Sequence, residues 1–355
     1  MTNHKVYYST ANEMADVPDN SVNLVVTSPP YPMIEMWDEI MKQQNEEIEK
    51  QWEKENYNEA FELMHKVLDK VWQECYRVLD DGGVACINIG DATRTLSKNF
   101  VLYSNHSRII SACLKIGFQN LPNIIWRKQT NAPNKFMGSG MLPPGAYVTL
   151  EHEYILVLRK GTKREFKSQE SKDLRSESAF FWEERNQWFS DIWEVKGTRQ
   201  KFKDEVRKRS GAFPFDIPYR LINMFSVKGD TVLDPFMGTG TTALAAMASN
   251  RNSIGFEIDS KFEPTIVENL LGTESMLNQV ISDRINRHIK FTDLRKAEKG
   301  SDCFKYQNSH YGFPVMTRQE LGIAFEYVKK VSYENKSFVT NYHGINVLEN
   351  PLALF

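Results

Sequence analysis

The sequence has few cysteines and no long apolar run, and both absences exclude classes of protein. None of the four cysteines forms a Cys-x-x-Cys pair with another (Cys75, Cys86, Cys113 and Cys303). This disfavours a structural zinc site and a disulfide framework and suits the reducing cytoplasm. No apolar run approaches the about 18 residues of a membrane span, and the segment after Met1 lacks the apolar core of a signal peptide. We therefore expect a cytoplasmic protein with no membrane partner.

Net charge is nearly absent as well. The 44 Lys and Arg residues stand against 46 Asp and Glu residues, so the net charge of −2 gives no global electrostatic argument for a polyanionic partner. The seven histidines are dispersed, and His152, which stands between two glutamates, has no further ligand cluster elsewhere in the sequence. We therefore predict no bound metal, and a polyanionic partner has to be inferred from local patterns.

Short apolar runs alternate along the chain with helical patterns. Apolar residues three or four apart from Ala60 to Leu79 predict a helix, which Asp81-Gly82-Gly83 ends before a buried strand at 84–89. A helix followed by a buried strand is typical of a crossover unit in a parallel sheet. Further strands are predicted at 22–26, 123–126, 154–158, 231–233 and 253–256, and further helices at 107–115, 218–225 and 241–249. We expect an α/β fold with a doubly wound, mostly parallel sheet.

Two stretches carry a local charge bias. Residues 35–62 have ten acidic residues against three lysines, which predicts a solvated helical segment. Residues 159–209 have fifteen basic against ten acidic residues, interleaved with Phe180, Phe181, Trp182, Trp188, Phe189 and Trp193. Basic residues with exposed aromatics would suit phosphate contact and base stacking. The alternative is an ordinary subdomain with its own aromatic core.

A rigid tetrapeptide follows the first buried strand. The apolar run at 22–26 stops abruptly before Ser28-Pro29-Pro30-Tyr31. This places the four residues at the carboxyl end of a parallel strand, where ligands bind in open α/β sheets.

A glycine-rich loop follows a later strand. The sequence from Asp234 to Thr242 joins that strand to an alanine-rich helix, an arrangement in which backbone amides approach a ligand closely. The loop lacks both the Gly-Lys-Ser/Thr ending of a P-loop and the full dinucleotide pattern. The next strand ends at Glu257, where a carboxylate can take both hydroxyls of a ribose. A ribose-containing ligand without a diphosphate is therefore expected, held by Asp234, Pro235, Phe236, Gly238, Gly240, Thr241, Thr242 and Glu257.

Together the two motifs, Thr27 to Tyr31 and Asp234 to Gly240, resemble the beta-class amino-methyltransferases of DNA, in which the catalytic motif precedes the cofactor motif. The resemblance covers most of residues 5–262 and includes the segments 77–83, 151–157 and 213–218. It implies the methyltransferase fold and S-adenosyl-L-methionine as cofactor. It also implies cofactor contacts from Asn12 and Pro214.

The chemistry explains why such a loop is useful. The lone pair of a cytosine N4 or adenine N6 amine is delocalised into the ring, so the amine is a poor nucleophile until acceptors draw its protons out of the base plane. Ser28 offers a hydroxyl oxygen, and Pro29 and Pro30 hold the neighbouring carbonyls rigidly. Tyr31 offers a flat face to a base rotated out of the duplex. We therefore predict Ser28, Pro29, Pro30 and Tyr31 as the catalytic residues.

The first residue of the tetrapeptide bears on the substrate. In the family that the chain resembles, serine at this position usually accompanies cytosine N4 methylation and aspartate usually accompanies adenine N6 methylation. We therefore expect a site-specific enzyme that methylates cytosine N4 in double-stranded DNA and protects it from a partner restriction endonuclease. The alternatives are an N6-adenine DNA methyltransferase and a non-catalytic, S-adenosylmethionine-binding nucleic-acid module.

Target recognition is expected outside the two motifs. Lys128, Asn131, Asn134 and Lys135 carry polar groups suited to phosphate or base edges, and the loop at 138–145 is of a kind that closes over DNA or merely connects two strands. The basic cluster after residue 280 suits either a DNA-facing extension or a packed tail. The expected parts are a catalytic half at 1–126, a target-recognition insertion at 127–215, a cofactor-binding half at 216–279 and a C-terminal extension at 280–355.

Overall fold

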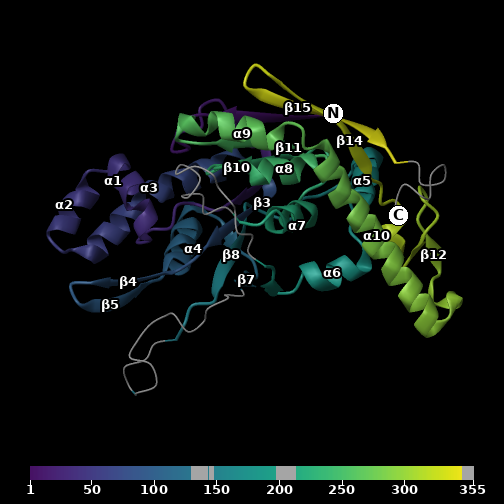
Figure 1. Cartoon of the computed structure of the whole chain (residues 1–355), viewed down its shortest axis with the longest axis horizontal. Coiled ribbons are helices and arrows are strands. Elements are labelled where there is room, and N and C mark those ends of the chain that lie inside the picture. Colours follow the sequence, from purple (N-terminus) through teal and green to yellow (C-terminus); the bar gives the residue numbers. More distant parts are fainter. Residues whose placement is uncertain (129–142, 144–147, 197–212, 346–355) are drawn as a thin grey trace.

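The computed structural model describes residues 1–128, 143, 148–196 and 213–345. Within these residues, eleven strands form one sheet in the order β14-β15-β1-β11-β10-β2-β3-β8-β7-β9, with β6 paired to β8 (Figure 1). Their bounds are β1 Thr2–Tyr7, β2 Val22–Thr27, β3 Leu79–Ile89, β6 Gln119–Asn120, β7 Ile124–Arg127, β8 His152–Arg159, β9 Ile192–Glu194, β10 Thr231–Asp234, β11 Asn252–Phe256, β14 Glu326–Glu334 and β15 Ser337–Gly344.

The centre of the sheet is parallel. Strands β1, β11, β10, β2 and β3 run in one direction, whereas β8 pairs antiparallel with both β3 and β7. The predicted doubly wound, mostly parallel fold is therefore confirmed. The carboxyl ends of β2 and β10 are neighbours, so the two predicted loops start side by side at one edge of the sheet.

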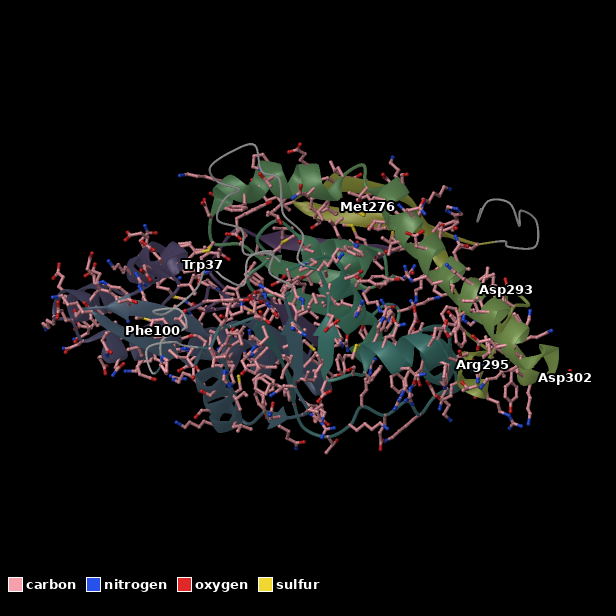
Figure 2. All side chains as sticks on the ribbon, turned by 60° about the horizontal axis from the view of Figure 1, so that its bottom comes forward. Trp37, Phe100, Met276, Asp293, Arg295 and Asp302 are labelled. Atoms are coloured by element: carbon pink, nitrogen blue, oxygen red, sulfur yellow. The ribbon has the colours of Figure 1, made fainter. Side chains whose placement is uncertain are left out.

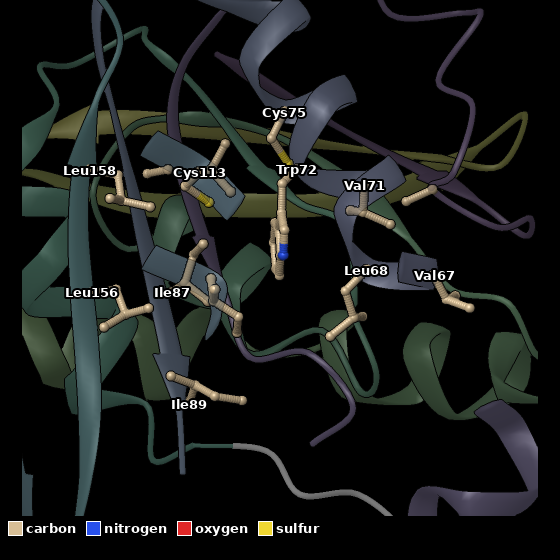
Figure 3. Close-up of a cluster of buried hydrophobic side chains, with 14 of the residues drawn as sticks. Val67, Leu68, Val71, Trp72, Cys75, Ile87, Ile89, Cys113, Leu156 and Leu158 are labelled. Atoms are coloured by element: carbon tan, nitrogen blue, oxygen red, sulfur yellow. The ribbon is translucent and has the colours of Figure 1, made fainter. Parts of the chain in front are cut away.

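Helices cover both faces of the sheet. Helix α3 supplies much of one core, in which Trp72 is 1% exposed and packs with Ile87 of β3 and Leu156 of β8. Figure 3 shows these side chains gathered between α3 and the strands. Helices α7 and α8 cover the opposite face. The helix bounds are α1 Asp38–Gln44, α2 Glu47–Glu53, α3 Tyr57–Val78, α4 Asn105–Ile116, α5 Gln169–Glu177, α6 Trp182–Trp188, α7 Asp216–Phe225, α8 Thr241–Met247, α9 Glu263–Leu270 and α10 Glu274–Lys299, with short 3-10 helices at Glu35–Trp37, Ser260–Phe262, Ser301–Cys303 and Arg318–Glu320.

Opposite ends of the molecule carry the additions to the sheet. Helices α1 and α2 and the hairpin of β4 (Ala92–Leu96) and β5 (Asn99–Tyr103) lie at one end, and α10 with β12 (Tyr306–Gln307) and its partner β13 (Pro314–Val315) lies at the other (Figure 1). In Figure 2, Phe100 of β5 and Asp302, just after α10, mark these two ends.

The acidic segment at 35–62 is helical, as predicted, but it is only partly solvated. Met41 of α1 and Ile48 of α2 are fully buried, and Trp37 and Ile40 line the large cavity described below. The segment therefore forms one wall of that cavity.

The C-terminal region contains two strands of the central sheet, which the sequence analysis did not predict. Strand β15 pairs antiparallel with β1, and β14 pairs with β15. Charged side chains occupy several positions of β14, including Lys329, Lys330 and Glu334, which obscured the apolar alternation of the strand. The region therefore extends the central sheet.

The aromatic residues at 180–193 mostly form a core. Phe181, Trp188 and Trp193 are at most 5% exposed, so the interpretation of the aromatic cluster as an exposed stacking surface is wrong for these three. Phe181 packs with Ile285 of α10 and with Phe325, which ties the insertion to the C-terminal region. Phe189 is 44% exposed. Asn131, Asn134, Lys135, the 138–145 loop apart from Pro143, and the basic residues at 197–209 lie outside the described residues.

No helix in the described part of the chain is long and apolar enough to cross a membrane.

Candidate active site

One cavity brings the two predicted motifs together. It has a volume of about 1000 Å³ and lies at the carboxyl ends of β2 and β10. Twelve of the fourteen predicted site residues line it: Asn12, Ser28, Pro29, Pro30, Tyr31, Asp234, Pro235, Phe236, Gly238, Thr241, Thr242 and Glu257. The volume is at the upper end of the about 300–1,000 Å³ usual for small-molecule sites, which gives room for a nucleoside-sized ligand and a single base.

Two predicted residues do not line the cavity. Gly240 precedes α8 with φ of 90°, a conformation that favours glycine, and its N–H donates to the Met237 carbonyl. Its position is explained by the turn. Pro214 is buried, while its neighbour Phe213 lines the cavity instead.

Tyr31 is held by a network of polar groups at the cavity wall. Its hydroxyl lies 3.1 Å from the Ser28 Oγ, donates to the Glu153 Oε2 at 3.0 Å and accepts from the Asn88 Nδ2 at 2.8 Å. A Cβ at Gly90 would come within 3.1 Å of the Tyr31 ring, so glycine at position 90 lets the ring pack closely. Burial and the nearby Glu153 carboxylate raise the pKa of Tyr31 well above its usual value, which keeps the phenol protonated.

Glu153 is a site residue that sequence reasoning did not select. Its carboxylate is 13% exposed, accepts from the Asn88 Nδ2 at 2.7 Å and pairs with the Lys128 ammonium group. Lys128 in turn lies over the Trp126 ring, 4.4 Å from its centroid. The motif at 151–157 marked this segment, but only the antiparallel pairing of β8 with β3 brings Glu153 next to Asn88.

Asp234 connects the two loops. One of its carboxylate oxygens accepts from the Thr27 Oγ1 and the other from the Thr242 Oγ1, both at 2.6 Å. The Phe236 N–H adds a third hydrogen bond at 3.1 Å. Burial raises the pKa of Asp234, and the threonine hydrogen bonds oppose that shift. Thr27 directly precedes Ser28, so this carboxylate fixes the catalytic loop relative to the start of α8.

Glu257 also lines the cavity and directly follows β11. Its Oε2 accepts from the Gly238 N–H at 3.0 Å and its Oε1 from the Asp259 N–H at 2.9 Å. Each oxygen keeps capacity for one further hydrogen bond. Burial raises the pKa of Glu257 to about 7, and the two backbone hydrogen bonds oppose the shift. A diol that donates to this carboxylate would complete its hydrogen bonding.

Among the described residues, no group of three or more His, Cys, Asp or Glu side chains is placed to hold a metal ion. The side chains that surround the cavity include hydroxyl, carboxylate and aromatic groups.

The mostly parallel sheet, with its cavity beyond the ends of β2 and β10, is the fold of S-adenosylmethionine-dependent methyltransferases. A solved structure supports this class: a Thermus thermophilus protein, assigned as a DNA modification methylase and complexed with S-adenosyl-L-methionine, is 33% identical with a TM-score of 0.58, over 75% of this chain and 93% of the other. The PvuII DNA methyltransferase, described as cytosine-N4-specific, shares the fold at 17% identity and a TM-score of 0.50, over 81% of this chain and 94% of that one.

The chain belongs to the DNA methylase family, whose model matches residues 22–268. It is 49% identical over 351 residues to the type II methyltransferase M.MthZI of Methanothermobacter thermautotrophicus, covering 97% of this chain and 96% of the relative. It is 54% identical over 280 residues to the type II methyltransferase M.MjaI of Methanocaldococcus jannaschii, covering 76% of this chain and 91% of the relative. The predicted DNA methyltransferase activity and the S-adenosylmethionine cofactor are confirmed at this level.

Proposed function

We propose that the chain is a site-specific DNA methyltransferase that transfers the methyl group of S-adenosylmethionine to the N4 amine of cytosine in double-stranded DNA. The choice of base rests on Ser28, which has a neutral hydroxyl. In the beta-class amino-methyltransferases that the chain resembles, the adenine enzymes usually have aspartate at this position. Ser28 lines the cavity on the same wall as Tyr31. The N6 amine of adenine is the alternative substrate, and the test below separates the two.

The residues around the cavity fit the cofactor. The Glu257 carboxylate suits the ribose hydroxyls, and the aromatic side chains of Phe236 and Phe256 give apolar walls for the adenine ring. Asn12 also lines the cavity and adds an amide group. The bound cofactor supplies an electrophilic methyl group attached to a sulfonium.

The tetrapeptide then prepares the amine. The Ser28 Oγ accepts a hydrogen bond from one N–H of the amine, and a backbone carbonyl beside Pro29 or Pro30 accepts one from the other, which draws the lone pair out of conjugation with the ring. The amine nitrogen forms a bond to the methyl carbon while the carbon–sulfur bond breaks, and the positively charged methylated amine then loses one proton to water. Tyr31 stacks on the extruded base and offsets part of the few kcal/mol that unstacking costs. No metal and no covalent bond to the protein are needed in this mechanism.

We also propose that the methylation protects DNA from a restriction endonuclease that cuts the same site without forming a stable complex with this protein. The two relatives described above are named type II methyltransferases, which supports this role. The insertion at 127–215, together with the C-terminal region that packs on it, is the proposed target-recognition part.

Mass spectrometry of nucleosides tests the proposal. DNA from a host that expresses the chain is digested and compared with DNA from the same host expressing Ser28→Ala, which lacks the acceptor hydroxyl. N4-methylcytosine in the first sample and not in the second supports the proposal. N6-methyladenine without N4-methylcytosine refutes the choice of base, and the absence of any methylated base in host or added DNA supports the non-catalytic alternative.

A further inference from the structure

The hydrogen bonds around Tyr31 have a direction that the chemistry of their partners determines. An ionised Glu153 carboxylate is an acceptor only, so the Tyr31 hydroxyl donates its single proton to it. The Asn88 amide donates to both Tyr31 and Glu153 through its Nδ2. The reverse amide orientation would place two acceptors 2.7 Å apart, which excludes it.

Ser28 is the next group in this chain of hydrogen bonds. Tyr31 has no second proton, so the 3.1 Å contact between the two hydroxyls requires Ser28 to donate and Tyr31 to accept. The Asn88 Nδ2 has two protons, both used by closer partners, and lies 3.4 Å from the Ser28 Oγ. Ser28 therefore has its proton directed toward the protein and its lone pairs free for a ligand in the cavity.

We propose that Glu153 is a positioning residue that sets the direction of this hydrogen-bond chain, so that Ser28 meets the target amine as an acceptor. The inference rests on the proposed function, in which the Ser28 hydroxyl accepts a hydrogen bond from the target amine. A hydroxyl that presented its own proton would face the amine with a donor and leave the lone pair conjugated.

Lys128 fixes the orientation of any amide placed at position 153. In Glu153→Gln the carbonyl oxygen of the new side chain faces the Lys128 ammonium group, because the amide nitrogen would meet a like charge there. The amide nitrogen then faces both the Tyr31 hydroxyl and the Asn88 Nδ2, so Tyr31 loses its acceptor and two donors oppose each other. The hydrogen bonds that draw the Ser28 proton toward the protein are thereby disrupted.

This disruption predicts a rescue by a second substitution. Single-turnover methyl transfer to unmethylated plasmid DNA is measured with saturating DNA and cofactor. Glu153→Gln should slow transfer about 100-fold, because the lone pairs of the Ser28 hydroxyl are no longer directed at the reacting amine. Replacing Lys128 by methionine as well frees the amide to turn its oxygen back to Tyr31, so the double variant should be about tenfold faster than Glu153→Gln alone.

A matched control variant, and the same substitution made in the Tyr31→Phe variant, separate this role from loss of structure. Glu59 of α3 is also a glutamate that pairs with a lysine, Lys66 at 3.8 Å, and its side chain is 54% exposed and outside the cavity, so Glu59→Gln should transfer methyl groups at the wild-type rate. In Tyr31→Phe the hydrogen bonds between Ser28, residue 31 and Glu153 are already absent. In that variant Glu153→Gln should change the rate by less than about twofold. Calorimetric affinity for S-adenosylmethionine should be the same in wild type and Glu153→Gln.

The outcomes are distinguishable. Equal rates for Glu153→Gln and Glu59→Gln would overturn the inference, and so would a double variant no faster than Glu153→Gln. If Glu153→Gln is slow and its effect is just as large in Tyr31→Phe, Glu153 acts by a route other than the hydrogen bonds through Tyr31. That result would also overturn the inference. If the wild type transfers no methyl group to DNA, the proposed function itself fails.

Discussion

The two loops of the active site are supported in different ways. In the cofactor loop, Asp234 bonds to Thr242 eight residues later, and Glu257 bonds to Gly238 nineteen residues earlier. In the catalytic loop, the groups that hold Tyr31 come from positions 57 and 122 residues further along the chain. The cofactor loop is thus determined largely by its own sequence, whereas the catalytic loop depends on the order of strands in the sheet.

Asp234 is where the two loops meet, so its loss should have the largest effect. Asp234→Ala leaves the hydroxyls of Thr27 and Thr242 without their acceptor, at a cost of about 1–3 kcal/mol for each buried group. Release of the loop that carries Ser28 should slow methyl transfer by about 100- to 1,000-fold. Denaturant unfolding and single-turnover rates measure the two effects.

Asp234→Asn is the control for this prediction, because it keeps one acceptor oxygen and nearly the same volume. It should lose less stability and less activity than Asp234→Ala. A fully active Asp234→Ala protein would show that the two loops hold their positions independently.

Tyr31→Ala tests the catalytic loop alone. Removal of the ring takes away the proposed stacking face and breaks the contacts to Ser28, Asn88 and Glu153, so turnover should fall about 100-fold. Tyr31 makes no hydrogen bond to the cofactor loop among the bonds described above, so calorimetric affinity for S-adenosylmethionine should stay within about twofold of wild type. A large loss of cofactor affinity would reassign Tyr31 to the cofactor side of the cavity.

Glu257→Ala should have the reverse effect. Two charge-assisted hydrogen bonds to the ribose would be lost, and cofactor affinity should fall about 10- to 100-fold. The rate of single-turnover transfer at saturating cofactor should change much less, because Glu257 follows β11 and Ser28 follows β2, and β10 lies between these two strands. An unchanged affinity in the same calorimetric titration would exclude Glu257 as a cofactor ligand.

The contrast between the loops also explains what sequence reasoning predicted. Strands such as β2 and β10, and the motifs at their ends, have local patterns, so the fold class and twelve of the lining residues could be named in advance. Glu153 and Asn88 could not, because their meeting depends on β8 lying antiparallel beside β3. Strands β14 and β15 were missed because charged and polar residues interrupt their alternation.

The aromatic residues of the insertion were ambiguous for a related reason. Phe181 and Trp193 are buried by packing against distant partners, Phe181 against α10 and Trp193 in the core beneath the sheet. The sequence shows that aromatic and basic residues are interleaved in this stretch. Only the tertiary contacts decide which of them face solvent.

The smallest expected effect is a pH dependence that belongs to the cofactor loop alone. In the free protein burial raises the pKa of Glu257 to about 7 from its usual 4.5. Because the folded-state pKa is the higher one, the stability that protonation of Glu257 contributes is complete below about pH 4.5 and is lost as the pH rises through 7.

Cofactor binding has the opposite dependence, since the ribose hydroxyls donate to the ionised carboxylate. Affinity for S-adenosylmethionine should therefore rise about tenfold between pH 6 and pH 8, as the protonated fraction falls from about nine-tenths to one-tenth. Calorimetric titrations at the two pH values measure the change, and Glu257→Gln should abolish it, because a glutamine does not titrate. The rate of transfer from the fully loaded enzyme should not follow this titration. A tenfold change that persists in Glu257→Gln would place the titrating group elsewhere.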